Sequence, residues 1–337
     1  MSELRRDPTT DQWVIIAPER GRRPRQSPSQ LEKPTHALPF DPTCPFCPGN
    51  ESQLPAIIAA MPSTKTPGWR TRVVPNKFPA VSQNVTYSKQ KTALHQAAAC
   101  RGNHEVVIES PRHDHDLTTM PEQQVRDVLA TYRNRYVALM ADNAVTSVIV
   151  FRNRGKTAGA SLLHPHAQLI ALDTIAPLVR ARQATMLSYY QKEKRCVLCD
   201  IVTYERDNSS RVVSENDGFM TTVPFAASAP CEMWLLPKYH RADFGDLPDA
   251  EVELLAIALR EALARLRKAL DDPPYDYVID TAGKGASETA ALHWRLRIMP
   301  RVTVAGGFEL GSGLPINPSL PEEDAAALRS VRPILGS

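Results

Sequence analysis

An internal repeat constrains the fold of this chain more than any other feature of its sequence. The segments "EVVIESPRH" (105–113) and "EMWLLPKYH" (232–240) each begin with a glutamate, continue as an apolar strand and end in a histidine. A proline, Pro121 or Pro248, stands eight residues beyond each histidine. The same order then follows in both halves: a helical pattern, an apolar strand, a Gly-Lys turn and a second strand with a histidine. This order predicts two copies of one structural unit.

The repeat also predicts the architecture. Apolar residues at helical spacing indicate one main helix in each half, at roughly 121–141 and 248–270. We predict an α+β fold of two tandem domains, each with an antiparallel sheet and one main crossing helix. The expected domains are residues 1–177 and 178–337, since a chain of 337 residues is long enough for two.

Each half carries side chains suited to a zinc ion. "CPFCPGNE" and "CVLCD" contain C-x-x-C pairs, and two histidines at matching positions of the repeat follow each pair. Structural zinc sites commonly combine two cysteines with two histidines. The predicted ligands are Cys44, Cys47, His113 and His164 in the first half, and Cys196, Cys199, His240 and His293 in the second. His115 is a rival for His113, but the spacing from the glutamate favours His113.

Two other interpretations of the cysteine pairs remain open. One is a redox role for each pair, and the other is a set of reduced cysteines packed beside histidines that are ordinary strand residues. A zinc ribbon is disfavoured, because its two cysteine pairs lie only ~15–20 residues apart. Ligands that are distant in sequence suit a metal whose binding stabilises the fold.

One histidine is left over once the metal sets are complete. In "HPHAQ", His166 and Gln168 follow His164 at alternate positions, whereas the second half carries arginine at both matching positions. Alternate residues of a strand share a face, so we expect these three side chains to point the same way. A surplus imidazole suits a nucleophile that attacks phosphorus. "GKTAGAS" (155–161) adds a lysine, small residues and Ser161 for phosphate oxygens, which indicates phosphoryl or nucleotidyl transfer.

The composition disfavours several other classes of function. A formal net charge of +3 gives no general reason to bind nucleic acid, although the arginines of "ERGRRPRQ" form either a solvated arm or an anion-binding loop. No apolar run approaches the ~18 residues of a membrane span, and the N-terminus is too polar for a secretory signal. We therefore expect a soluble, cytoplasmic protein with reduced cysteines that binds neither nucleic acid nor membranes.

The motifs resemble a known family over nearly the whole chain. "HPHAQ" resembles the H-P-H-x-Q active-site signature of the galactose-1-phosphate uridylyltransferase family, a branch of the histidine-triad superfamily. "DPTTDQWVIIAPERGRRPRQ" resembles its N-terminal segment, "CPFCPGNE" its first cysteine pair and "RVVPNKFPA" its nucleotide-binding strand. "SPRH" resembles the segment with its third zinc ligand, and "GGFELGSG" (306–313) its C-terminal hexose-side segment.

The resemblance implies a double displacement. His166 would attack the α-phosphorus of a nucleotide sugar and release a hexose 1-phosphate, and a second phosphate-bearing acceptor would then take the nucleotidyl group. Gln168 would hydrogen-bond the phosphoryl group in transfer. The resemblance also implies a homodimer with active sites at its interface and, in both halves, a histidine-triad fold whose antiparallel sheet forms a half-barrel. The positions that match phosphate contacts are Asn153, Gly159 and Ser161, and those that match the nucleotide side are Arg20, Arg23 and Asn76.

Three functions follow from these observations. The first is uridylyl transfer between a UDP-sugar such as UDP-glucose and a hexose 1-phosphate, as in galactose metabolism. The second is adenylyl transfer of the ADP-glucose phosphorylase type with inorganic phosphate as acceptor, because the complete Cys-Cys-His-His set of the second half resembles that branch. Thr303 and Phe308 also stand where the best-known galactose enzymes carry lysine and tyrosine. The third, from another class, is a zinc-stabilised protein that binds nucleotides without turnover, for which a surplus nucleophile would have little use.

Overall fold

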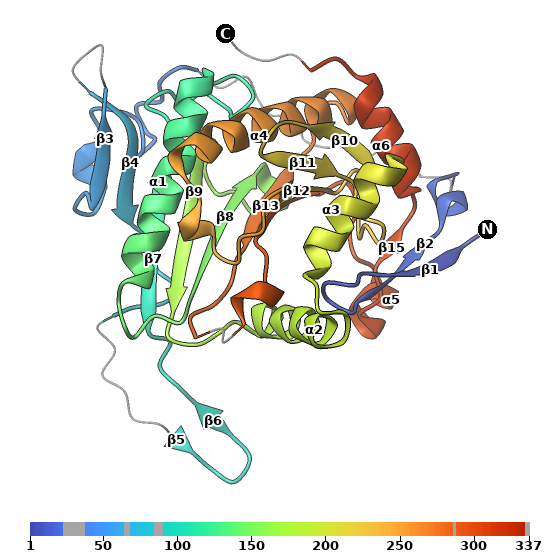
Figure 1. Ribbon diagram of the computed structural model, residues 1–337. Helices are drawn as coiled ribbons and strands as arrows, with labels where there is room; N and C mark the ends of the chain where they lie inside the picture. Colours follow the sequence, from blue (N-terminus) through green and yellow to red (C-terminus); the bar gives the residue numbers. More distant parts are fainter. Residues whose placement is uncertain (23–37, 64–67, 84–89, 286–287, 334–337) are drawn as a thin grey trace.

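A long antiparallel sheet forms the centre of the computed structural model, which describes residues 1–22, 38–63, 68–83, 90–285 and 288–333 (Figure 1). Within these residues ten strands pair in the order β10-β11-β12-β14-β13-β8-β9-β7-β4-β3. The first half contributes β3 (Ala59–Pro62), β4 (Trp69–Pro75), β7 (Gly102–Ile108), β8 (Ser147–Arg154) and β9 (His166–Leu172). The second half contributes β10 (Val212–Glu215), β11 (Phe219–Thr222), β12 (Met233–Pro237), β13 (Tyr275–Asp280) and β14 (Arg295–Pro300).

The strand order repeats between the two halves. The first half runs β8-β9-β7-β4 and the second runs β13-β14-β12-β11, outward from the centre in each case. The halves join where β8 pairs antiparallel with β13, with Val150 opposite Ile279 and Asn153 opposite Asp276. The predicted α+β fold with antiparallel sheets is confirmed, and the two sets of strands form one continuous sheet. The division into domains at residue 177 stays a prediction.

Two long helices cover one face of the sheet. Helix α1 (Glu122–Met140) and helix α4 (Asp249–Ala269) lie within one residue of the predicted ranges at each end. Pro121 and Pro248 precede them, as suits a residue whose missing N–H is not needed at a helix start. The apolar stripes of both helices, which include Val125 and Leu255, pack on the sheet as one core. Each fully buried side chain of this kind contributes about 1.5–3 kcal/mol to folding.

The opposite face is covered differently in the two halves. Helices α2 (Pro177–Glu193) and α3 (Val197–Asn208) pack over the strands of the second half, through a smaller core that contains Met186, Leu198 and Trp234. In the first half this face carries the residues around His166. The side chains of His166 and Gln168 remain partly accessible there.

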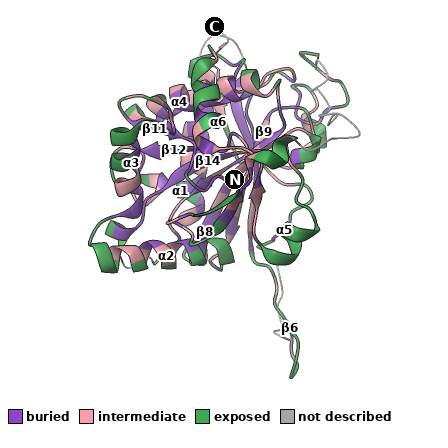
Figure 2. Cartoon of the chain, turned by 90° about the vertical axis from the view of Figure 1, so that its right-hand side faces the viewer, coloured by how far each residue is buried: buried purple, intermediate pink, exposed green. Residues whose placement is uncertain are grey.

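Shorter elements complete the fold. Strands β1 (Glu3–Arg6), β2 (Trp13–Ile16) and β15 (Ile316–Asn317) form a small separate sheet, beside the 3-10 helix η1 (Pro18–Arg22). Helices α5 (Gly307–Ser312) and α6 (Pro321–Ser330) lie at the C-terminal end. The hairpin of β5 (Gln90–Lys91) and β6 (Gln96–Ala97) projects from the body, and Figure 2 shows β6 as exposed. Within the described ranges, no helix is both long and apolar enough to cross a bilayer.

Candidate active site and metal sites

His166 is the first residue of β9, and its neighbours determine the direction of its side chain. Ala167, Leu169 and Ala171 are buried against the helix-covered core, so His166 and Gln168 project from the opposite face. His164 lies before the strand and is fully buried. The expectation that all three polar side chains share a strand face therefore holds for His166 and Gln168 but not for His164.

The imidazole of His166 is held in one tautomer. Its Nδ1 lies 2.8 Å from the backbone carbonyl oxygen of His164. Since a carbonyl oxygen only accepts, Nδ1 carries the proton and Nε2 presents a lone pair. Burial lowers the pKa of His166, which favours the neutral ring. The Phe46 ring packs edge-on against this imidazole, with 5.4 Å between ring centroids. The arrangement is that of an oriented nitrogen nucleophile.

The four predicted ligands of the first half meet at one point. Nδ1 of His113 lies 3.5 Å and Nδ1 of His164 lies 3.6 Å from Sγ of Cys47, and all four donor atoms, with that of Cys44, lie within 4.8 Å of one another. A tetrahedral zinc with Zn–S ≈ 2.3 Å and Zn–N ≈ 2.0–2.1 Å needs sulfur and nitrogen about 3.6 Å apart. The donor set therefore fits zinc.

A second hydrogen bond orients His164 toward the cysteines. Its Nε2 donates to the carbonyl oxygen of Ser110 at 2.8 Å, which leaves the Nδ1 lone pair facing Cys47. Burial lowers the pKa of His164 to about 4, and the neutral ring is the form that binds metal. His115 stays outside the cluster and instead pairs its Nδ1 with Ser110 Oγ at 2.8 Å. The structure thus assembles His113, and not its rival, with the cysteines.

The second half assembles a matching set of donor atoms. Sγ of Cys199 lies 3.4 Å from Nδ1 of His240 and 3.5 Å from Nδ1 of His293, and Sγ of Cys196 lies 3.8 Å from the latter nitrogen. Nε2 of His240 donates to the carbonyl oxygen of Thr289 at 3.2 Å. These four residues also fit zinc. A bound ion would join the start of α3 to the loops before α4 and β14, and so stabilise the second half.

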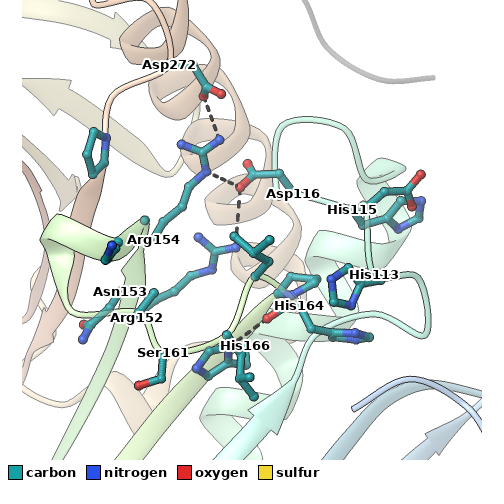
Figure 3. A pocket seen from close by; sticks show the side chains of 18 of the residues that line it. His113, His115, Asp116, Arg152, Asn153, Arg154, Ser161, His164, His166 and Asp272 are labelled. Carbon is teal, nitrogen blue, oxygen red and sulfur yellow. Dashed lines mark hydrogen bonds and ion pairs between the residues drawn. The ribbon is translucent and has the colours of Figure 1, made fainter. Parts of the chain in front are cut away.

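A cavity of about 720 Å³ opens beside His166. Figure 3 shows Asn153, Ser161 and His166 on one side of it, with a chain of charged residues on the other. Gly155 shapes its wall with φ = +88°, and a Cβ at this position would lie 2.8 Å from Cβ of Pro274. Both observations require glycine here. The volume lies in the range of small-molecule sites.

Buried ion pairs support the floor of this cavity. Arg152 donates through Nε to both carboxylate oxygens of Glu109, at 2.9 and 3.1 Å, and both residues are buried. Arg154 pairs with Asp116 at 2.7 Å and with Asp272 at 2.7 Å. Burial alone would raise the pKa of Asp116, but the guanidinium groups of Arg154 and Arg152 hold it well below its usual range. Arg152 and Arg154 are thus paired with carboxylates within the protein, and Asn153, Ser161 and Lys156 also line the cavity.

The remaining predicted residues are placed in three ways. Asn153 and Ser161 line the cavity with His166, and Gly159 adopts a left-handed conformation next to Asn153. Asn76 Nδ2 donates to Oε1 of Gln168 at 3.3 Å. Arg20 is exposed on η1 and does not line the cavity in this chain. Arg23 lies outside the described residues.

Sequence reasoning missed one residue of the site. His104 on β7 lies beside Gln168, with its Nε2 2.8 Å from Oε1 of Gln168. The available signal was a histidine inside the apolar strand that opens the first repeat, on the face that β7 shares with Gln168.

Comparison with known proteins places the chain in a family. Residues 1–176 match the family model for the N-terminal domain of galactose-1-phosphate uridyl transferase. An ADP-glucose phosphorylase of Arabidopsis thaliana is 36% identical over 333 residues, which cover 98% of this chain and 93% of that protein. The chain belongs to the galactose-1-phosphate uridylyltransferase family.

Other members of the family extend the similarity. Galactose-1-phosphate uridylyltransferase of Thermotoga maritima is 28% identical over 98% of both chains. The crystal structure of an Arabidopsis thaliana ADP-glucose phosphorylase with bound ADP-glucose has a TM-score of 0.85 and 34% sequence identity, and the match covers 98% of this chain and 99% of that one. Both relatives are named as enzymes, and with the family match they show that the protein is an enzyme of the nucleotidyltransferase type.

Proposed function

We propose that this protein transfers a UMP group between a UDP-sugar and a hexose 1-phosphate by double displacement through His166. One observation carries the proposal. The hydrogen bond from His166 Nδ1 to the carbonyl oxygen of His164 leaves Nε2 free to attack, at the edge of a cavity that Asn153 and Ser161 also line. The second half has Arg295 at the matching position, so only the first half carries this nucleophile.

In the first displacement, the Nε2 lone pair of His166 forms a bond to the α-phosphorus. The bond from that phosphorus to the bridging oxygen breaks, and its electron pair leaves with the hexose 1-phosphate. The imidazole then carries positive charge, which the carbonyl oxygen of His164 stabilises through the Nδ1–H bond. Asn153, Ser161 and Gln168 donate to the phosphoryl oxygens.

In the second displacement, a phosphate oxygen of the acceptor attacks the same phosphorus. The N–P bond breaks, and its electron pair returns to His166 as the neutral imidazole. The Cys-Cys-His-His residues of each half would hold one structural zinc ion, and the first of these sites fixes the carbonyl that orients His166. The proposed form is a cytoplasmic homodimer. The exposed position of Arg20, away from the cavity of its own chain, supports a role toward a second copy.

Adenylyl transfer from ADP-glucose to inorganic phosphate is the second candidate. The similarity to the plant ADP-glucose phosphorylase favours it, with 36% identity over 98% of this chain and a TM-score of 0.85. Both candidates use the same nucleophile and differ in the base and in the acceptor.

The test is to mix the purified protein with UDP-glucose or ADP-glucose, each labelled at the α-phosphate. We expect acid-labile label on the wild type and none on His166→Ala, whose thermal stability and zinc content are checked in parallel. His95→Ala, which changes an exposed histidine of the β5–β6 hairpin, is the matched control and should label normally. Galactose 1-phosphate or inorganic phosphate is then added to identify the acceptor. Nucleotide binding without label from either donor would overturn the proposal in favour of a binding protein.

A further inference from the structure

Three neighbouring strands of the first half bring a group of polar side chains together beside His166. Asn76 follows β4, His104 lies on β7 and Gln168 lies on β9. In the β7–β9 register Val106 is opposite Gln168, and His104 is two residues before Val106, so His104 and Gln168 are diagonal neighbours on one face. The inference that follows rests on the proposed function, because it concerns what Gln168 does for the transferred phosphoryl group.

The tautomer of His104 is determined by the backbone. The N–H of Ala80 donates to Nδ1 of His104 at 3.1 Å. Nδ1 is therefore an acceptor, and Nε2 carries the proton of the neutral ring. Burial lowers the pKa of His104, which favours this neutral form. Nε2 then donates to Oε1 of Gln168 at 2.8 Å. Asn76 Nδ2 lies 3.2 Å from the same nitrogen, and because both are donors in this tautomer, each directs its hydrogen to the shared acceptor Oε1.

This bond determines which end of the Gln168 amide faces the site. Oε1 accepts from His104 at 2.8 Å and from Asn76 Nδ2 at 3.3 Å, and no hydrogen bond of Nε2 is found among the described residues. An amide turned by 180° would place its NH₂ group against two donors. It would also present a carbonyl oxygen to the phosphoryl group, whose oxygens accept hydrogen bonds and carry negative charge.

We propose that His104 is a positioning residue that holds the Gln168 amide with its NH₂ group toward the transferred phosphoryl group. The turn after β4 holds His104 in place. The N–H of Asn76 donates to the carbonyl oxygen of His104 at 2.8 Å, and the N–H of Phe78 donates to Oδ1 of Asn76 at 2.9 Å. His104 is thus held through its backbone carbonyl by Asn76 and through Nδ1 of its ring by Ala80, which leaves Nε2 directed at Gln168.

Substitutions at His104 can separate its two hydrogen bonds. His104→Gln places an amide NH₂ near the position of Nε2, and so keeps a donor for Gln168 while it removes the acceptor for Ala80. His104→Asn keeps an acceptor near the position of Nδ1, and so retains the bond from Ala80 without reaching Gln168. His104→Leu removes both. The assay is the single-turnover rate of nucleotidyl-enzyme formation from the donor that labels the wild type, with KM and kcat measured at steady state.

We expect His104→Leu and His104→Asn to lower kcat roughly 10- to 100-fold, by analogy with the loss caused by removing hydrogen-bond partners that orient metal ligands. KM should change less than kcat, and His104→Gln should recover most of the rate. In a Gln168→Ala background, His104→Leu should lower the rate by no more than about twofold further, since His104 acts through Gln168.

Two results would overturn this inference while leaving the proposed function intact. One is a His104→Leu variant that labels at the wild-type rate. The other is rescue by asparagine and not by glutamine, which would assign His104 to the turn that contains Ala80. Failure of the wild type to label with either donor would instead refute the proposed function. His95→Leu, an exposed histidine replaced in the same way, is the matched control and should label at the wild-type rate.

Discussion

Replacing Asp280 with asparagine should lower the free energy of unfolding by about 3–5 kcal/mol, the usual result of removing one partner from a buried ion pair. Its carboxylate is buried and lies 2.6 Å from Arg182, 2.6 Å from Arg297 and 3.2 Å from Arg295. Each contact at about 3 Å is worth roughly 5–6 kcal/mol at an effective dielectric constant of ~20, set against several kcal/mol of desolvation for each ion. Asparagine keeps the shape but leaves three guanidinium groups without their carboxylate.

The pH dependence has a definite sign. Burial alone would raise the pKa of Asp280, but Arg297, Arg182 and Arg295 hold it well below its usual range. An acid whose folded-state pKa is depressed stabilises the fold above its unfolded value of about 4, and that contribution is lost as the pH falls through the folded value. The difference in free energy of unfolding between the wild type and Asp280→Asn should therefore have its full value at pH 7 and become smaller as the pH falls below about 4.

Asp276, on the same strand, is the matched control. Its nearest cation is Arg301, at 3.6 Å, and burial raises the pKa of Asp276 to about 6. Ionisation of this side chain therefore lowers the free energy of unfolding. The loss develops as the pH rises from about 4 to about 6, and it amounts to about 1.4 kcal/mol for each unit by which the folded-state pKa exceeds the unfolded one. Asp276→Asn should leave the free energy of unfolding unchanged or raise it at pH 7. Below a pH of about 4, the variant and the wild type should have the same free energy of unfolding.

Urea unfolding of the zinc-loaded protein at pH 7 and pH 5 measures both variants, with thermal unfolding as a second readout. At pH 5 the destabilisation by Asp280→Asn should still be nearly full, whereas the effect of Asp276→Asn should already be smaller than at pH 7. Asp280→Asn should melt roughly 6–10 °C below the wild type, from about 2 °C per kcal/mol in a large domain. If Asp280→Asn and Asp276→Asn have free energies of unfolding within about 1 kcal/mol of each other, the three arginines do not depend on Asp280 and the reasoning is refuted.

Three further predictions use the same preparations. Glu109→Gln should lower the free energy of unfolding by about 3–5 kcal/mol in urea, because Arg152 loses its buried partner, and an unchanged midpoint would contradict this. Cys47→Ser and Cys199→Ser should each remove one zinc ion per chain, as measured by elemental analysis. Only Cys47→Ser should abolish labelling, because its site holds His164, and equal losses of labelling in the two variants would contradict this expectation. Gly155→Ala should destabilise by at least about 1 kcal/mol, whereas Gly311→Ala, in open space within α5, should be neutral or slightly stabilising in the same urea titration.

Local patterns account for the parts of the fold that could be predicted. Helical periodicity located α1 and α4 to within one residue, because a buried apolar stripe recurs along the helix itself. The register from the glutamate selected His113 over His115, and the structure assembles His113 with the cysteines. Both are signals that the chain carries within a short stretch or repeats at a fixed offset.

Parts that depend on pairing between distant strands could not be predicted. The pairing of β8 with β13 joins the two halves into one sheet. Pairing between the edge strands of two units produces no periodic pattern of residues in either half, so the sequence does not predict it. The sequence places His164 on the strand face of His166, but Pro165 lies between them and has no N–H for a ladder bond. Strand β9 begins at His166, directly after this proline, and the side chain of His164 lies against Cys47 instead. His104 acquires its role only from a diagonal contact between β7 and β9.

The two halves share one strand arrangement but carry different side chains at the positions of His166 and Gln168. At the positions that match His166 and Gln168, the second half carries Arg295 and Arg297, and Asp280 on the neighbouring strand forms an ion pair with each. Arg182 of α2 contacts the same carboxylate, and the position that His166 occupies on the open face of the first half is held in the second by the fully buried Arg295. A buried guanidinium cannot act as a nucleophile, and its charge requires a buried partner. In the proposed function, the second half therefore uses these positions for stability, and the first half, whose face remains accessible, performs the chemistry.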